Sequence, residues 1–155
     1  MIYLHSNLPH KCPIIHKDLK PANIIISNQG VLKIIDLGIS GLTKLQDAIG
    51  RIKTSILNKR GGTFLYQAPE HFNSSKEYEV TLACDVWSFA LVVGEILSGK
   101  LPTGYYAWVK GQTISGRHFP YPVGDQVTIL RFFLWKCLKV KFSERLTFNQ
   151  LKDEL

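Results

Sequence analysis

Residues 86–97 constrain the fold more than any other stretch, because they are apolar on every side of a helix. One side carries Val86, Phe89, Ala90, Val93 and Leu97 at helical spacing, and the other sides carry Trp87, Leu91, Val92 and Ile96. A helix that is apolar all round is surrounded by other elements. The run is shorter than a membrane span and contains Glu95. We therefore expect a central helix that is buried on all sides and ended by residues 99–102.

The other segments predict a mainly α fold with a small β-hairpin. The β-branched runs 24–26 and 31–35 flank the turn residues 27–30, which is typical of two paired strands. Residues 36–70 lose the apolar period and are punctuated by glycines, which predicts one long loop. Further helices are expected at residues 1–6, 126–138 and 147–155.

Length and composition indicate one folded unit. A chain of 155 residues is of ordinary domain size, and 45% apolar with 20% charged residues excludes wholesale disorder. The net charge of +7 favours acidic partners, but no block of five or six basic residues is present. Basic residues interleaved with aromatic residues are absent as well. We expect an ordinary solvated basic surface and no nucleic-acid partner.

Sequence features that report on location favour the cytoplasm. Cys12, Cys84 and Cys137 are an odd number of distant cysteines without a C-x-x-C pair, which favours free thiols in a reducing compartment. Residues 1–13 lack the order of a signal peptide, and we expect no membrane association. Residues 152–155 spell Lys-Asp-Glu-Leu, an address that is read only in the lumen, so we treat the match as coincidental.

Four polar residues near the predicted hairpin carry the functional signal. Asn23 begins the hairpin, Asp36 ends it, and Asp18 and Lys20 lie on the loop before it. Carboxylate and amide oxygens are ligands that Mg²⁺ accepts together with substrate phosphates. A carboxylate that takes a hydroxyl proton, a nearby cation and two metal ligands are the parts that phosphoryl transfer requires.

These residues and the motifs around them, taken in order, resemble the C-terminal lobe of a eukaryotic protein kinase. The first match is the catalytic loop from His16 through Asp18 to Asn23, followed by the metal triplet Asp36-Leu37-Gly38. Further matches are Gly62-Thr63-x-x-Tyr66, Ala68-Pro69-Glu70, Asp85-Val86-Trp87-Ser88, and Trp135-x-Cys137-Leu138 before Arg145. The resemblance covers residues 1–155, with an activation segment at about 36–70 and a helical lobe at about 71–155. It implies an α+β family member, and we expect this chain to lack the N-terminal β lobe.

The resemblance implies a role for each site residue. Asp18, Lys20 and Thr63 would be catalytic, with Asp18 as the base and Lys20 near the γ-phosphate of ATP. Lys20, Asn23 and Asp36 would bind the cofactor, and the last two would hold Mg²⁺. Lys20 and Thr63 resemble the residues of serine/threonine kinases at these positions. Other motifs resemble those of the tyrosine-kinase-like group. The substrate would be a protein.

Three further implications concern architecture and regulation. Glu70 would pair with Arg145, and Asp85 would bind the backbone of the catalytic loop. Lys17 replaces the usual Arg, which puts in doubt the gripping of a phosphorylated loop, and hydroxyls in the long loop such as Thr54 are better interpreted as ordinary loop residues.

A motif that the sequence lacks leaves a second functional interpretation open. The sequence contains no G-x-G-x-x-G, so we expect the chain alone to bind nucleotide weakly and to transfer phosphate negligibly. The alternative is a non-catalytic kinase-like interaction module with a regulatory protein partner.

Overall fold

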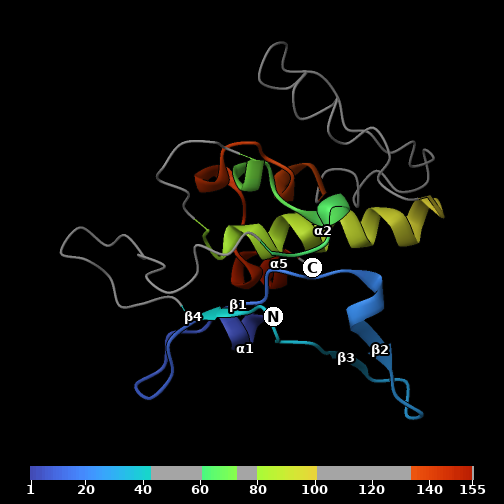
Figure 1. The fold of residues 1–155 in the computed structure, drawn as a ribbon, viewed down its shortest axis with the longest axis horizontal. Coiled ribbons are helices and arrows are strands. Elements are labelled where there is room, and N and C mark those ends of the chain that lie inside the picture. Colours follow the sequence, from blue (N-terminus) through green and yellow to red (C-terminus); the bar gives the residue numbers. More distant parts are fainter. Residues whose placement is uncertain (43–60, 73–79, 101–133, 155) are drawn as a thin grey trace.

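The computed structural model describes residues 1–42, 61–72, 80–100 and 134–154 (Figure 1). Its helices are α1 (Ile2–His5), α2 (Ala83–Ser98) and α5 (Phe148–Glu154), and residues 134–137 are also helical. Its strands are β1 (Ile14–Ile15), β2 (Ile24–Ile26), β3 (Leu32–Ile34) and β4 (Gly41–Leu42). Single 3-10 turns are η1 (Pro21–Asn23), η2 (Phe64–Tyr66), η3 (Pro69–Phe72) and η5 (Phe142–Glu144). The described fold is therefore rich in helix, with two small antiparallel sheets, as the mainly α prediction requires.

Helix α2 lies at the centre of the described fold, as expected. Figure 1 shows the N-terminal strands on one side of it and the η2, η3 and η5 turns on the other. Trp87 and Leu91 are fully buried in its middle, against a core that includes Ile15, Leu134, Phe148 and Leu151. The helix ends at Gly99, whose φ of 64° is a left-handed conformation that glycine adopts easily. The expectation of burial on all sides is wrong for the last turn, where Ile96 is 70% exposed.

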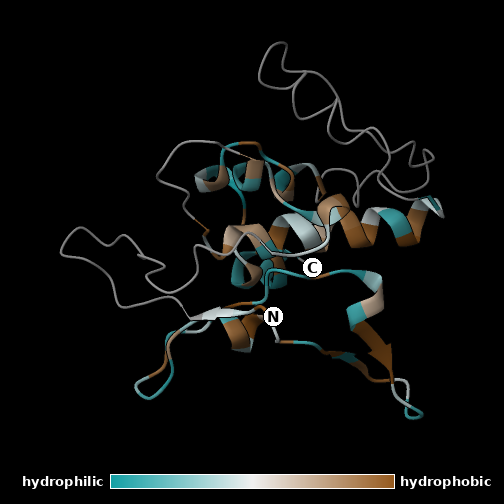
Figure 2. Cartoon of the chain, in the orientation of Figure 1, coloured by the Kyte–Doolittle hydropathy of each residue, from teal (hydrophilic) through white to brown (hydrophobic). Residues whose placement is uncertain are grey.

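The predicted hairpin is present, with a shorter second strand. β2 pairs with β3 in antiparallel register, Ile24 opposite Ile34 and Ile26 opposite Leu32. The pair at the turn is open to solvent, Ile26 being 70% and Leu32 66% exposed. Figure 2 shows β2 as one of the most hydrophobic segments of the chain, at the edge of the fold. The hairpin thus presents an apolar face that no described element covers.

The prediction of one continuous loop over residues 36–70 is wrong at three places. β4 pairs with β1, with Ile14 opposite Leu42, and η2 and η3 form near its end. Two-residue strands and single 3-10 turns are too short to produce an apolar period, so the pattern of apolar residues could not reveal them. The pairing of β1 with β4 fixes the chain on both sides of the hairpin.

The terminal segments pack together beside α2. The ammonium group of Lys11 donates hydrogen bonds to the carbonyls of Leu4 and Ser6 at 2.9 and 3.1 Å, which caps the end of α1. The expected helices at 1–6 and 147–155 are observed with slightly shorter bounds. Most of the helix expected at 126–138 lies outside the described residues. Within the part that the structure describes, no helix is both long and apolar enough to cross a membrane.

Candidate catalytic site

Asp18 is the centre of a hydrogen-bonded cluster on the loop between β1 and η1. Its Oδ1 accepts from the backbone N–H of Thr63 at 2.7 Å and from the Thr63 hydroxyl at 2.8 Å. Its Oδ2 lies 2.8 Å from Lys20 Nζ, which also donates to Thr63 Oγ1 at 2.7 Å. The structure therefore brings together Asp18, Lys20 and Thr63, three residues that the sequence predicted as catalytic and that span 45 positions.

The same contacts hold Asp18 in its ionised form. Burial alone would raise the pKa of this carboxyl, but the hydrogen bonds from Lys20 and Thr63 outweigh burial and lower it. A carboxylate with a lowered pKa keeps its charge at neutral pH. The charged side chain can therefore accept a hydrogen bond from a hydroxyl group.

Asn23 joins the cluster through its amide nitrogen. Nδ2 donates to the backbone carbonyl of Asp18 at 2.8 Å and lies 3.2 Å from Asp18 Oδ2. Because the nitrogen faces Asp18, the amide oxygen is the atom that can serve as a ligand. The buried position of Asn23 at the end of η1 fixes this orientation.

Asp36 lies beside Asn23 but outside the cluster. The N–H of Ile35 donates to the backbone carbonyl of Asn23 at 2.9 Å, which brings the residue before Asp36 next to Asn23. Asp36 itself is exposed, has a φ of 65°, and accepts the N–H of Gly38 at 3.1 Å. In the described part of the chain it makes no hydrogen bond or ion pair with Asp18, Lys20 or Thr63.

The donor set of Asn23 and Asp36 fits Mg²⁺. One carboxylate and one amide oxygen are hard ligands, and Mg²⁺ takes few ligands from protein while keeping waters and phosphate oxygens. Within the described residues, no group of three or more His, Cys, Asp or Glu could hold a metal ion. Asn23 and Asp36 therefore have the ligand chemistry that Mg²⁺ accepts.

Asp85 holds the backbone that precedes Asp18. From the first turn of α2, its Oδ2 accepts the N–H of His16 at 2.7 Å and its Oδ1 accepts that of Lys17 at 2.9 Å. His5 Nε2 lies 2.8 Å from Oδ2 as well. These bonds confirm the expected contact of Asp85 with the catalytic loop, and they stabilise a left-handed φ of 71° at Lys17.

Lys17 lies in the interior, unlike a residue that binds a group at the protein surface. Its side chain is buried, and its Nζ has no hydrogen-bond partner among the described residues. Burial lowers the pKa of this amine, while Cys84 and Asp85 act in the opposite direction. Thr54 and the other loop hydroxyls considered above lie outside the described residues.

Glu70 and Arg145 form the expected ion pair. Arg145 Nη1 and Nη2 donate to the two carboxylate oxygens at 2.7 Å each, which is the parallel, two-bond geometry of a strong pair. Burial alone would raise the pKa of Glu70, but the bonds from Arg145 lower it. The pair connects the start of η3 to the segment before α5.

Gly62 is required next to the site. Its φ of 103° is unfavourable for any other residue, and a Cβ there would lie 2.5 Å from the carbonyl oxygen of Lys17. We expect Gly62→Ala to displace Thr63 from Asp18 and to lower the free energy of unfolding by about 2–3 kcal/mol. Gly30→Ala is the matched control: its φ is 75° but no atom lies within 4 Å, so about 1 kcal/mol is expected. Equal losses for the two variants in urea unfolding would refute the clash.

The Glu70–Arg145 pair should make stability depend on pH in the acid range. Because the pKa of Glu70 is lowered in the fold, its contribution is present at neutral pH and is lost as the pH falls through the folded pKa. The melting-temperature gap between the wild type and Glu70→Gln should therefore be widest near neutrality and close below about pH 4. Glu144→Gln, at an exposed glutamate, should change the melting temperature little at any pH. A gap for Glu70→Gln that stayed constant from pH 7 to 3 would contradict this assignment.

A match to a known protein family covers the residues described above. The model of the protein kinase domain matches residues 1–154. This chain belongs to the protein kinase family. The match includes every residue of the Asp18 cluster, the Asn23–Asp36 pair and both partners of the Glu70–Arg145 pair.

Relatives of this kinase-family chain come from plants and animals. U-box domain-containing protein 70 of Oryza sativa subsp. japonica is 40% identical over 104 residues, which is 67% of this chain and 12% of that protein. LRR receptor-like serine/threonine-protein kinase FEI 2 of Arabidopsis thaliana is 39% identical over 118 residues, 75% of this chain and 18% of that one. Receptor-interacting serine/threonine-protein kinase 2 of Bos taurus is 32% identical over 100 residues, 64% and 18% respectively. The chain thus spans less than a fifth of each of these relatives.

One residue of the kinase site was not assigned from the sequence. His5 contacts Asp85 across 80 positions, and its ring packs edge-on against Phe148 with centroids 5.0 Å apart. A contact of this sequence separation leaves no local pattern, so only the fold could reveal it.

Proposed function

We propose that this chain is the C-terminal lobe of a protein serine/threonine kinase, which transfers the γ-phosphoryl group of ATP to a hydroxyl of a protein substrate. The observation that carries the proposal is the Asp18 cluster. An ionised carboxylate, a lysine 2.8 Å away and a threonine that bonds both are joined by contacts between their side chains. This is the set of groups that transfer to a hydroxyl needs.

The role of each residue follows from its position. Asp18 would orient the substrate hydroxyl and accept its proton as the oxygen attacks phosphorus. Lys20, on the same loop, would stabilise negative charge on the transferred group. Thr63 would hold both side chains, because it donates to the carboxylate and accepts from the ammonium.

Asn23 and Asp36 would hold Mg²⁺ through one amide oxygen and one carboxylate. The ion, when bound, neutralises charge on the phosphates. The chain's own contribution is to fix Asn23 by its two contacts with Asp18 and to bring Asp36 beside it through the bond from Ile35 to Asn23. The β2–β3 hairpin, which Asn23 precedes and Asp36 follows, would supply one wall for an adenine ring.

Preference for serine and threonine rests on the contact between Lys20 and Thr63. The lysine bridges Asp18 and Thr63, so it occupies space directly beside the base. A short aliphatic hydroxyl reaches a base in such a confined position more easily than a phenol does. Two of the relatives reported above are named serine/threonine kinases, which supports the same preference.

The exposed hairpin favours a second candidate, a non-catalytic kinase-like module that binds a regulatory protein. Ile26 and Leu32 are largely solvent-exposed, and an apolar surface of this kind usually meets another element or a partner. In this alternative the Asp18 cluster would serve only to stabilise the loop.

Phosphate transfer by the protein isolated from its native cells distinguishes the two functions. The immunoprecipitated protein is incubated with radiolabelled ATP, Mg²⁺ and peptides that carry serine, threonine or tyrosine as their only hydroxyl. We expect label on serine and threonine peptides, abolished by a chelator. Absence of transfer would reject the kinase proposal in favour of the interaction module. Transfer only to tyrosine would reject the substrate class.

A further inference from the structure

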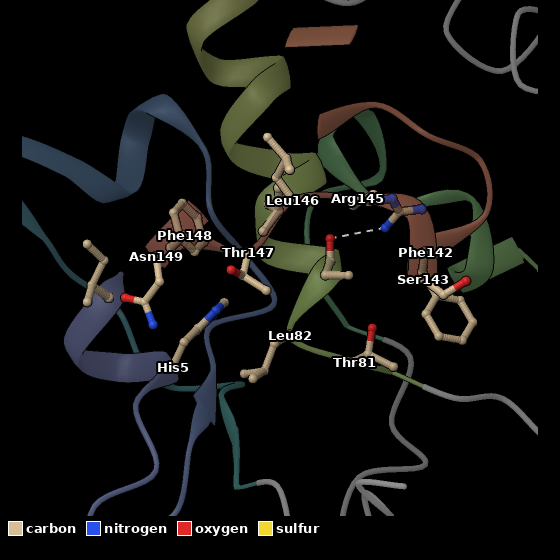
Figure 3. Close-up of a pocket in the computed structure, with 13 residues that line it drawn as sticks. His5, Thr81, Leu82, Phe142, Ser143, Arg145, Leu146, Thr147, Phe148 and Asn149 are labelled. Atoms are coloured by element: carbon tan, nitrogen blue, oxygen red, sulfur yellow. Dashed lines mark hydrogen bonds between the residues drawn. The ribbon is translucent and has the colours of Figure 1, made fainter. Parts of the chain in front are cut away.

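A cavity of about 340 Å³ lies beside the first turn of α2 (Figure 3). It is enclosed by α1, the first turn of α2 and the segment from η5 into α5. No residue of the Asp18 cluster and neither magnesium ligand lines it. Its volume falls at the lower end of the range for sites that bind small molecules, whereas well-packed interiors rarely hold voids larger than a water molecule.

The walls of the cavity are apolar and partly aromatic. Apolar side chains dominate the lining, which includes Ile2, Leu82, Val86, Phe142, Leu146 and Phe148. Figure 3 shows the His5 and Phe148 side chains on one side of the space and Phe142 on the opposite side. Aromatic rings in a wall favour an aromatic ligand, because edge and offset ring contacts add to the burial of surface.

The charged group in the wall cannot take an anion. Arg145 donates through Nε to Lys139 O, through Nη1 to Glu70 and Ala83 O, and through Nη2 to Glu70 and Val140 O. All five N–H donors of the guanidinium are therefore used. His5 Nε2, the other titratable contact in the wall, already faces Asp85. An ionised ligand would thus lose its hydration without gaining a charged partner.

Among the other polar groups of the lining, the Thr81 hydroxyl is buried and has no hydrogen-bond partner among the described residues. Ser143 and Asn149 line the cavity and are solvent-exposed. A ligand whose apolar body fills the cavity could place one uncharged polar group among them. We propose that this cavity is a binding site for a small, neutral aromatic molecule that carries one uncharged polar end.

The site is placed to reach the catalytic loop. His5 forms part of the wall and contacts Asp85, which in turn holds the N–H groups of His16 and Lys17. Two residues, His5 and Asp85, therefore connect an occupant that packs against His5 to the backbone before Asp18. Binding can be measured directly, so the test does not depend on phosphate transfer.

The test titrates the 155-residue chain with 2-phenylacetamide and with phenylacetate, which have nearly the same shape and differ in charge. Methyl NMR signals of Ile2, Leu82, Val86 and Leu146 report on the cavity. We expect 2-phenylacetamide to saturate these signals with a Kd on the order of 1 mM, and phenylacetate to bind at least about tenfold more weakly. Equal binding of the two probes, or no saturable shift, would overturn the proposal.

A filled cavity provides the second arm of the test. Leu82→Trp places a larger side chain in the space and should weaken binding of 2-phenylacetamide at least about tenfold. Ile96→Trp, at the exposed end of the same helix, is the matched control and should leave the Kd unchanged. If Leu82→Trp does not fold, as judged by circular dichroism, Leu146→Phe replaces it. Unchanged affinity in a folded cavity-filling variant would place the probe elsewhere and overturn the proposal.

Discussion

Replacing Arg145 with alanine is expected to lower the free energy of unfolding by about 3–5 kcal/mol, because it leaves the carboxylate of Glu70 buried without its cation. The guanidinium is completely buried and Glu70 is only 11% exposed. Three backbone carbonyls also lose their donor, and the ring of Trp87 loses the cation 4.8 Å from its centroid. A melt followed by circular dichroism should show a midpoint lower by about 6–20 °C, or no cooperative transition.

Two further variants separate the buried charge from the loss of any ion pair. Lys141→Ala breaks the exposed pair with Glu144, whose atoms are 3.3 Å apart, and should cost less than about 1 kcal/mol. Adding Glu70→Gln to Arg145→Ala removes the stranded charge and should recover part of the loss. An unchanged midpoint for Arg145→Ala would show that the pair is not needed for the fold.

Replacing Asp18 with asparagine is expected to reduce kcat for phosphate transfer by about 10²–10⁴-fold. Asparagine retains an oxygen that can accept from Thr63, so the loop should keep its shape. It has no carboxylate, however, and cannot accept the proton of a substrate hydroxyl. The measurement is the rate of transfer to a serine peptide by the full native protein, compared with its Asp18→Asn variant.

The matched control for this variant is Asp153→Asn, the same substitution at an exposed position of α5. It should leave both the rate and the melting temperature unchanged. A melting temperature of Asp18→Asn close to the wild type would assign the lost rate to chemistry. Retention of the full rate by a folded Asp18→Asn protein would remove Asp18 from the proposed mechanism.

Most of the candidate site could be predicted from the sequence because its residues are grouped in short motifs that follow one another in a recognisable order. The motifs around Asp18, Asn23 and Asp36 predicted the candidate site residues. Three of the four residues in the Asp18 cluster lie within six positions of one another. The pairing of Glu70 with Arg145, and the contact of Asp85 with the catalytic loop, followed from the kinase resemblance alone. No local pattern relates residues that are about 70 positions apart.

The features that were missed depend on packing over long distances or on very short elements. The β1–β4 pairing involves two residues on each strand, and the His5–Asp85 contact joins α1 to α2. The exposed last turn of α2 has the same apolar letters as its buried middle, so composition could not separate Ile96 from Leu91. The cavity beside α1 is a property of three segments together and has no counterpart in any one of them.

The dependence of the catalytic loop on Asp85 has a consequence for the order of folding. The loop is synthesised early, yet the acceptor for its His16 and Lys17 amides lies 69 and 68 residues later in the chain. Contacts of such separation form late, after the entropy of closing a long loop has been overcome. These amides should therefore exchange with solvent deuterium only when α2 separates from the loop, which requires opening of the core. The geometry at Asp18 is thus as durable as the core itself, although the loop has little regular structure of its own.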